Sequence, residues 1–426
     1  MNLFQKWLMC LIIAVFSATS LTAVEFELHG IIDTTFATGF WKTSEMLEAN
    51  VRFKPHLDFF ADDFHAVGSV ALEYSALDPL KVNVKLGEVF AEYAWERFDF
   101  RLGRQIITWG KADGLQITDI ICPRNYMNFI GVEYKDSRIP TNGIKVRHFG
   151  DFYTIEGIWT PVYIASFPKL DKNKPLSRVY FPEKIEMSGK EVSVEYNLKN
   201  KKPPHRIQDG EWGLKSSFFF SAIDFSFLFF RGWDHTPNYN TEVDTSPLMT
   251  GNPAKITLTP DHNRIWMVGM DMAIPAGMFI IRSEAAWLGK KAFAQKNATK
   301  PLSKHHQLKA MVGTECNPGQ GWRIQLQYME DVVFENTKKL NRSQRLPMLT
   351  FHLSKTFLRD TLKLSGGLLI GCDAWDTLTA INLSYDIIDN LKITLGGNLY
   401  CRGKKKGNFG KMERLSNIWL RGRFSF

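Results

Sequence analysis

Charged side chains recur at every second position of many extended segments in this sequence, and they are the groups best suited to act on a solute. Acids and bases share the predicted polar faces, and the bases predominate. In a pore, facing rows of opposite charge produce a transverse field, and a basic surplus favours anions. The residues on these faces are Arg52, Lys54, Asp58, Glu88, Glu92, Arg101, Lys145, Arg147, Lys215, Asp224, Arg282, Glu284, Lys309, Arg323, Lys363, Lys392, Arg421 and Arg423.

Five of these residues are taken as lumen-facing pore candidates: Arg52, Lys54, Arg323, Arg421 and Arg423. A second interpretation applies to the whole set. Most of the charges would then pair across neighbouring strands, where they would fill and stiffen the lumen.

The sequence lacks the motifs of common catalytic and metal sites. It contains neither a Gly-x-Ser-x-Gly elbow nor a His-Glu-x-x-His motif. Cys122, Cys316, Cys372 and Cys401 lack metal-ligand spacing, although an oxidising compartment could pair some of them as disulfides. We therefore expect no enzymatic activity, no metal and no cofactor.

The elements that carry these side chains are predicted to be β-strands. The chain has 426 residues, of which 44% are hydrophobic and 13% aromatic, so it has ample material to bury. After residue 19, no stretch approaches the roughly 20 apolar residues of a membrane-spanning helix. Apolar and polar residues instead alternate with period 2. About eighteen such segments start near residues 25, 47, 64, 84, 98, 143, 152, 210, 222, 264, 278, 306, 321, 348, 361, 377, 390 and 415.

The connections between these segments alternate between long and short. The long ones follow odd-numbered strands, whereas tight turns such as 61–63 and 389–390 follow even-numbered strands. Short periplasmic turns, long outer loops and an even strand count are typical of a transmembrane β-barrel. The alternative, a secreted all-β repeat protein, gives no reason for this asymmetry. We predict an all-β fold, an antiparallel transmembrane barrel of about 18 strands.

Both ends of the chain support export to the bacterial outer membrane. Residues 1–23 have a basic residue, an apolar run and small residues before a cleavage site, as in a secretory signal, and leave 24–426 as one barrel domain. The last strand places Phe424 and the terminal Phe426 on its apolar face. This ending resembles the assembly signal of outer-membrane barrels, and it implies the barrel-assembly machinery and outer-membrane lipids as partners.

The connection after the fifth strand is distinctive. Around Gly103 the alternation slips, as at a bulge, and the following residues are apolar and balanced in charge, so the loop could fold inward as a constriction. The Gly-Arg-Gln-x-x-x-Trp-Gly run at 103–110 and Cys122-Pro-Arg resemble a functionally unassigned family of bacterial outer-membrane proteins allied with porins and the alginate-export channel. The resemblance implies an inturned loop after this strand. Its constriction candidates are Arg101, Arg104, Gln105, Trp109 and Asp113.

A structural reading of the same motif has equal support. Trp109 and Tyr126 would then pack the inturned loop against the barrel wall as a clasp, without contacting a solute.

Positive charge collects in three long connections. Residues 161–206 hold ten Lys and Arg against five acids, 289–306 hold five Lys and no acid, and 402–414 hold six basic residues and one acid. Such a rim could attract anionic solutes or bind anionic surface sugars and lipid phosphates. A solvated loop face is the simpler interpretation. Nucleic acid is not expected as a partner of an exported barrel.

These features together predict a porin-like channel for passive passage of small hydrophilic solutes, with a modest anion bias. A surface adhesin or receptor is one alternative, because the basic loop at 161–206 includes a possible hairpin strand at 191–196. A gated channel for hydrophobic substrates is the other, because the Phe-rich stretches at 218–220 and 225–230 could line a conduit. The sequence leaves the oligomeric state open.

Overall fold

The computed structural model describes residues 24–426 except 42–43, 79–80, 127–129, 167–174, 188, 200, 202, 204–205, 237, 336 and 405–406. The predicted signal segment, 1–23, lies outside the described residues. No helix among the described residues is long and apolar enough to cross a membrane.

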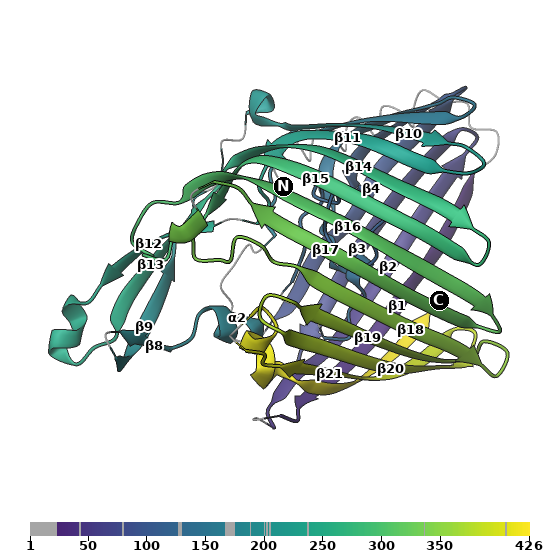
Figure 1. Cartoon of the computed structure of the whole chain (residues 1–426). Coiled ribbons are helices and arrows are strands. Elements are labelled where there is room, and N and C mark those ends of the chain that lie inside the picture. Colours follow the sequence, from purple (N-terminus) through teal and green to yellow (C-terminus); the bar gives the residue numbers. More distant parts are fainter. Residues whose placement is uncertain are drawn as a thin grey trace.

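Within the described chain, eighteen antiparallel strands form one closed barrel (Figure 1). Each strand pairs with the next barrel strand along the chain, and β22 pairs with β1. The strands are β1 (Glu25–Gly39), β2 (Met46–Ala61), β3 (Phe64–Ser75), β4 (Val82–Trp95), β5 (Phe98–Gln105), β6 (Thr141–Phe149), β7 (Tyr153–Thr160), β10 (Glu211–Phe219), β11 (Asp224–Trp233), β14 (Arg264–Ala276), β15 (Phe279–Phe293), β16 (Ser303–Gly319), β17 (Trp322–Val333), β18 (Met348–Phe357), β19 (Leu362–Gly371), β20 (Asp376–Ile388), β21 (Leu391–Cys401) and β22 (Asn417–Ser425).

The last residue of the chain completes the closure. Strands β1 and β22 pair from Ile31–Ser425 to Gly39–Asn417. Beyond this ladder, the Gly30 N–H donates to the Phe426 carbonyl at 2.9 Å, and the Phe426 N–H donates to the Gly30 carbonyl at 3.1 Å. Closure leaves no free sheet edge, which a barrel in lipid requires.

Side chains alternate between the two faces of the wall. On β22, Leu420 and Phe424 are exposed on the outer face, whereas Asn417 and Arg421 are buried on the inner face. On β1, Phe36 is exposed and Asp33 is buried. Outer faces are therefore apolar and suit lipid, while inner faces carry the charge.

A second sheet projects beyond one end of the barrel (Figure 1). It consists of β8 (Lys184–Met187), β9 (Lys190–Leu198), β12 (Asn238–Asp244) and β13 (Ala254–Asp261). Strands β8 and β9 belong to the long connection after β7, and β12 and β13 belong to the one after β11. Parallel pairing of β9 with β13 joins the two connections into one sheet. The sheet has its own apolar core, formed by Val194, Ala254, Ile256 and Leu258. Because long connections mark the outer side of such barrels, this is the extracellular end.

Short helices complete the connections. They are η1 (Tyr134–Ser137), α2 (Pro175–Tyr180), η2 (Ile207–Asp209), η3 (Ser246–Thr250), η4 (Thr337–Lys339) and η5 (Gly410–Leu415).

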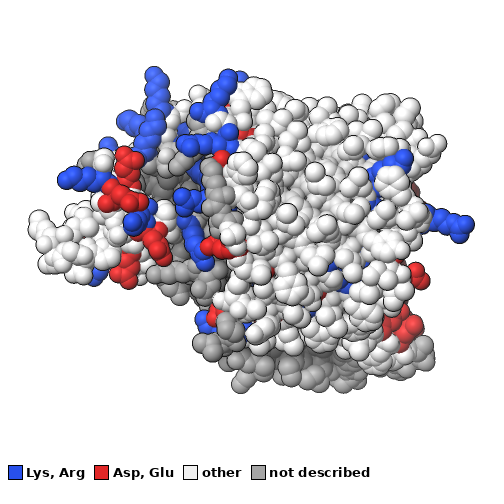
Figure 2. Space-filling view, turned by 90° about the horizontal axis from the view of Figure 1, so that it is seen from below, with Lys and Arg blue, Asp and Glu red and all other residues white. Residues whose placement is uncertain are grey.

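Figure 2 shows how charge is distributed on one face of the molecule. Lys and Arg gather at the end that carries the four-stranded sheet, while the barrel wall in this view is nearly free of charge. An uncharged band between charged ends fits a wall that lies in lipid.

The barrel and its strand count are confirmed, and every predicted strand start lies within three residues of the observed one. Strand β9 also forms where the sequence placed a hairpin strand at 191–196. The predicted bulge at Gly103 is wrong. The β5 ladders run without a register shift, and Gly103 takes up the distortion through a φ of +136° as the Val89 carbonyl approaches closely. Cys122, Cys316, Cys372 and Cys401 are free thiols.

Candidate channel constriction

The connection between β5 and β6, residues 106–140, reaches strands on other sides of the barrel. We call it the crossing segment. Asp113 of this segment contacts β17, which lies eight strands along the sheet from β5. In a barrel of eighteen strands this is nearly the opposite wall, so the segment spans the lumen.

A single carboxylate on β15 anchors the first half of the crossing segment. Glu284 is 2% exposed, and its two oxygens accept four hydrogen bonds from the segment. The backbone N–H groups of Lys111 and Ala112 each donate at 2.9 Å. Thr118 donates through its N–H at 2.7 Å and its hydroxyl at 2.6 Å. Charge-assisted bonds of this kind are among the strongest in proteins, so Glu284 fixes the path of the backbone.

The anchor requires glycine at position 110. Gly110 has a φ of +84°, and a Cβ built there would lie 2.5 Å from a Glu284 carboxylate oxygen and 2.6 Å from the Thr118 hydroxyl. Only glycine adopts this conformation without strain and leaves room for the carboxylate. This contact explains the glycine of the Trp-Gly pair in physical terms.

The underside of the segment is apolar and packs on the inner wall. Ile107, Trp109 and Ile117 are buried against Phe230 of β11 and Met267 of β14. The indole Nε1 of Trp109 donates to Glu156 of β7 at 2.6 Å. Trp109 is therefore fully enclosed, as the clasp interpretation requires.

Asp119 holds the second half of the segment. It pairs with the guanidinium of Arg124, which is fully buried, and accepts from Arg138 Nη2 at 2.8 Å. Arg124 also donates to the Tyr134 carbonyl at 3.0 Å, and its guanidinium lies 3.8 Å from the Tyr134 ring centroid. These contacts make this half of the segment a compact unit held by one carboxylate and two guanidinium groups.

The tip of the segment remains open to water. Asp113 has a side chain that is 49% exposed, and it accepts from Gln325 at 2.8 Å and Arg323 at 3.2 Å. Arg282 approaches it at 3.5 Å. Glu315 of β16 lies behind and accepts from Arg323 Nη2 at 3.0 Å. Exposed charges of both signs thus meet where the segment reaches β15 and β17.

Another charge cluster lies on β1, β2 and β22. Asp33 is buried and accepts from Arg423 Nε at 2.7 Å, Arg421 Nε at 3.1 Å and Arg52 Nε at 3.2 Å. The crossing segment meets this cluster as well, because Arg421 Nη1 donates to the Gly131 carbonyl at 2.9 Å.

The structure thus brings five of the predicted residues to the crossing segment: Trp109 and Asp113 belong to it, and Arg323, Arg421 and Arg423 contact it. Arg52 is linked to it only through Asp33. Gln105 is fully buried at the root of the segment and donates to the Gly143 carbonyl at 3.2 Å. It supports the backbone there and does not reach water.

The remaining candidates lie apart from the tip. Arg101 pairs with Glu92 of β4 and stacks over Phe90, and Arg104 donates to the Leu86 carbonyl at 3.2 Å. Lys54 lies on β2, two residues beyond Arg52 on the same face.

The assembly-signal candidates lie at the barrel closure. Phe424 is exposed on the outer face, and Phe426 stacks on Phe53 with ring centroids 5.9 Å apart.

Burial suppresses ionisation beneath the segment. The Cys122 thiol is enclosed, which raises its pKa to about 12, although the Ile107 N–H that donates to its sulfur at 3.2 Å opposes the shift. Burial likewise raises the pKa of Tyr126 to about 12. Both groups stay neutral near pH 7, so the chemistry available at the lumen is electrostatic and comes from the guanidinium and carboxylate groups.

Reading the sequence missed three residues that organise this site. Glu284 was only one of many polar-face residues, and Asp33 and Asp119 were not singled out. Asp33 lies on the polar face of β1 that the alternating pattern defines, so its position in the alternation was a usable signal. Asp119 sits in an irregular segment, where no periodicity marks it.

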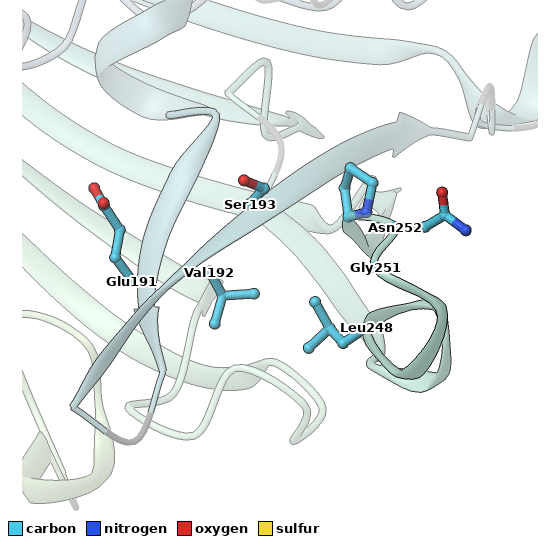
Figure 3. A pocket seen from close by; sticks show the side chains of 7 residues that line it. Glu191, Val192, Ser193, Leu248, Gly251 and Asn252 are labelled. Carbon is cyan, nitrogen blue, oxygen red and sulfur yellow. The ribbon is translucent and has the colours of Figure 1, made fainter.

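A pocket of about 280 Å³ lies outside the barrel, on the extracellular sheet (Figure 3). Figure 3 shows Val192 of β9 and Leu248 of η3 pointing toward one another across it. All its lining residues belong to β9 or to 248–253. A ligand in this pocket would therefore contact the extracellular connections and would lie outside the lumen.

The closed barrel, its charged interior and the lipid-facing apolar wall define a bacterial outer-membrane β-barrel. The sequence matches the family described as Protein of unknown function (DUF1302) over residues 58–395. Since this match covers most of the chain, the protein belongs to that family. No curated protein matches the sequence.

Solved structures share the fold at low identity. OccK8 (OprE) of Pseudomonas aeruginosa is 8% identical with a TM-score of 0.53, over 94% of this chain and 98% of that one. OccK11 (OpdR) of the same organism is 8% identical with a TM-score of 0.53, over 94% and 96%. The outer membrane channel DcaP of Acinetobacter baumannii is 11% identical with a TM-score of 0.47, over 96% and 99%. At this identity the similarity to the two OccK proteins concerns the fold alone.

Proposed function

We propose that this protein is a porin-like channel that passes small hydrophilic solutes passively through the outer membrane, with a modest preference for anions. The observation that carries the proposal is the tip of the crossing segment. There Asp113 and Arg323 have side chains that are 49% and 43% exposed, although they lie inside a barrel. Water-exposed charges of opposite sign where the crossing segment meets the wall are suited to sorting solutes by charge.

The anion preference is modest because most inner charges are paired. Asp33 balances part of the charge of Arg52, Arg421 and Arg423, and Glu315 balances Arg282 and Arg323. Further unbalanced positive charge lies in the extracellular connections, at the end where Figure 2 shows Lys and Arg gathered. We propose that this rim concentrates anions at the mouth.

Single-channel recording in a planar bilayer tests this proposal. Under a KCl gradient we expect stable conductance steps. We also expect a reversal potential whose sign shows that chloride permeates more readily than potassium. Arg323→Ala should reduce that preference. Arg97→Ala is a matched control, because Arg97 is an exposed arginine that pairs with Asp151 at a turn. If a folded barrel gives no conductance, the channel proposal is wrong.

The extracellular sheet favours a second candidate function, recognition of a surface ligand. It has its own apolar core and a pocket, and neither feature is needed to close the barrel. Deleting 184–198 should leave conductance intact and abolish ligand binding if the sheet is a receptor.

We also propose that the barrel-assembly machinery reads the terminal strand through Phe424 and Phe426.

A further inference from the structure

Three histidines and one aspartate gather on the inner face of β1, β2 and β3. His29 lies directly opposite His56 in the β1–β2 ladder, and Asp58 follows His56 by two residues on the same face. His65, near the start of β3, reaches the same carboxylate. The group lies close to the short turn between Ala61 of β2 and Phe64 of β3, and short turns mark the periplasmic side of such barrels. It is thus near the periplasmic mouth.

The spacing of the ligand atoms suits a tetrahedral metal ion. His29 Nδ1 lies 3.5 Å and His56 Nε2 lies 3.3 Å from Asp58 Oδ2. Metal–ligand bonds of about 2.0–2.1 Å at tetrahedral angles place neighbouring ligand atoms about 3.3–3.4 Å apart. One ligand atom from each of the three residues lies within 4.8 Å of the other two. A small movement of one imidazole would bring all three within bonding distance of one ion.

A neighbouring histidine, His65, already orients the Asp58 carboxylate. His65 Nε2 bonds to Asp58 Oδ1 at 2.8 Å, which leaves Oδ2 facing His29 and His56. The His65 ring stacks on Phe60 with centroids 4.5 Å apart and planes 3° from parallel. A fixed outer partner of this type is characteristic of carboxylates that ligate metals.

The group is also accessible from water. The His29 side chain is 54% exposed and the His56 side chain is 22% exposed, while Asp58 is 10% exposed at the base. An ion can therefore enter from the lumen and keep a water molecule as its fourth ligand.

We propose that His29, His56 and Asp58 form a binding site for a divalent transition-metal ion such as Zn²⁺ at the periplasmic mouth of the barrel, with His65 as a positioning residue. Two imidazoles and one carboxylate suit zinc, cobalt, nickel or copper, whereas magnesium and calcium prefer oxygen ligands only. The site lies on a wall strand away from the crossing segment, and its occupancy does not depend on whether the pore conducts.

The test is a titration of the protein, purified from outer membranes in detergent without a histidine tag, with Co²⁺ and then Zn²⁺. We expect saturable binding of one ion per chain, with the visible absorption of tetrahedral Co²⁺ that Zn²⁺ abolishes. His29→Ala and His56→Ala should each weaken binding by more than about tenfold. His352→Ala is the matched control, because His352 lies on β18, far from the cluster in the sheet, and should bind as the wild type does.

A second pair of variants tests the role of His65. His65→Ala should weaken binding by about tenfold, and His65→Gln, which retains an N–H donor for Asp58, should restore most of it. A heat-dependent shift in gel mobility verifies that every variant is folded. Binding that is not saturable in the folded wild type, or that His352→Ala weakens as much as His56→Ala does, would overturn the proposal.

Discussion

Glu284 and Asp113, two of the carboxylates that hold the crossing segment, do so in opposite ways. Glu284 is 2% exposed and receives four hydrogen bonds from the segment, three of them from backbone N–H groups. Asp113 belongs to the segment itself, is 49% exposed and bonds only side chains of the wall. The comparison separates two tasks: the buried carboxylate sets the path of the chain, and the exposed one presents charge to the lumen.

The largest effect is expected for Glu284→Ala. Loss of the carboxylate leaves the buried N–H of Thr118 and the half-buried N–H groups of Lys111 and Ala112 without acceptors, at a local cost of about 3 kcal/mol or more. Hydrogen exchange across residues 107–122, followed by mass spectrometry, should show loss of protection. Glu315→Ala is the control, because Glu315 is a buried inner-face glutamate on β16 that bonds wall residues and not the segment. Unchanged protection in Glu284→Ala would refute the anchoring role.

Two glycines of the segment sharpen the comparison. Gly110→Ala places a Cβ against the Glu284 carboxylate and also strains a positive φ, so we expect about 2–4 kcal/mol of destabilisation. Gly114→Ala has a similar φ of +74° but open space around its Cβ, so strain alone should cost about 1 kcal/mol. Thermal gel-shift midpoints of the two variants can be compared directly. Equal midpoints would mean that close packing on Glu284 contributes nothing.

A smaller effect on stability is expected for Asp113→Asn. The ion pairs of Asp113 are exposed, so their loss should cost less than about 1 kcal/mol. Removal of one negative charge beside Arg323 and Arg282 should nevertheless shift the reversal potential toward chloride. Asp151→Asn, at an exposed periplasmic turn, provides the control. A reversal potential that does not move would place the tip outside the conduction path.

The smallest signal is expected from Cys122 in the unaltered segment. Burial raises its pKa to about 12, so at pH 8 the thiol is protonated and shielded, and a maleimide should not label it. The measurement uses a chain in which Cys316, Cys372 and Cys401 are replaced by Ser. Labelling should appear when Glu284→Ala is added. Rapid labelling without that change would show that the segment does not pack on the wall as described.

The period-2 alternation of apolar and polar residues was sufficient to predict the barrel. A strand between lipid and water must present apolar side chains on one face and polar side chains on the other. The start of β3 at Phe64 and the start of β18 at Met348 were both predicted to the residue. The bulge predicted at Gly103 was wrong because a glycine can absorb a distortion in its own dihedral angle without shifting the ladder.

The organisation of the constriction could not be predicted in the same way. Glu284 and Lys111 are 173 residues apart, and alternation assigns Glu284 to the inner face without indicating what it meets. Trp109 was predicted either to contact a solute or to pack as a clasp, and its complete burial agrees with the clasp. Likewise, alternate residues of the Phe-rich stretch on β11 face opposite sides of the barrel wall. Phe227 and Phe229 face outward, while Leu228 and Phe230 pack beneath the crossing segment.

The histidine cluster illustrates the same limit. His29 and His56 lie on inner faces by parity, but only the register of the β1–β2 ladder places them opposite one another. That register is set by pairing along the whole hairpin. Spacing along the chain therefore gave no metal motif.

The most direct test compares single-channel conductance of the wild type with that of Glu284→Ala in the same bilayers, with Glu315→Ala as reference. If the crossing segment narrows a conducting lumen and Glu284 holds it there, Glu284→Ala should conduct clearly more than both the wild type and Glu315→Ala, with larger fluctuations. Equal conductance of Glu284→Ala and the wild type, in barrels that are folded, would contradict the claim that this segment forms the constriction.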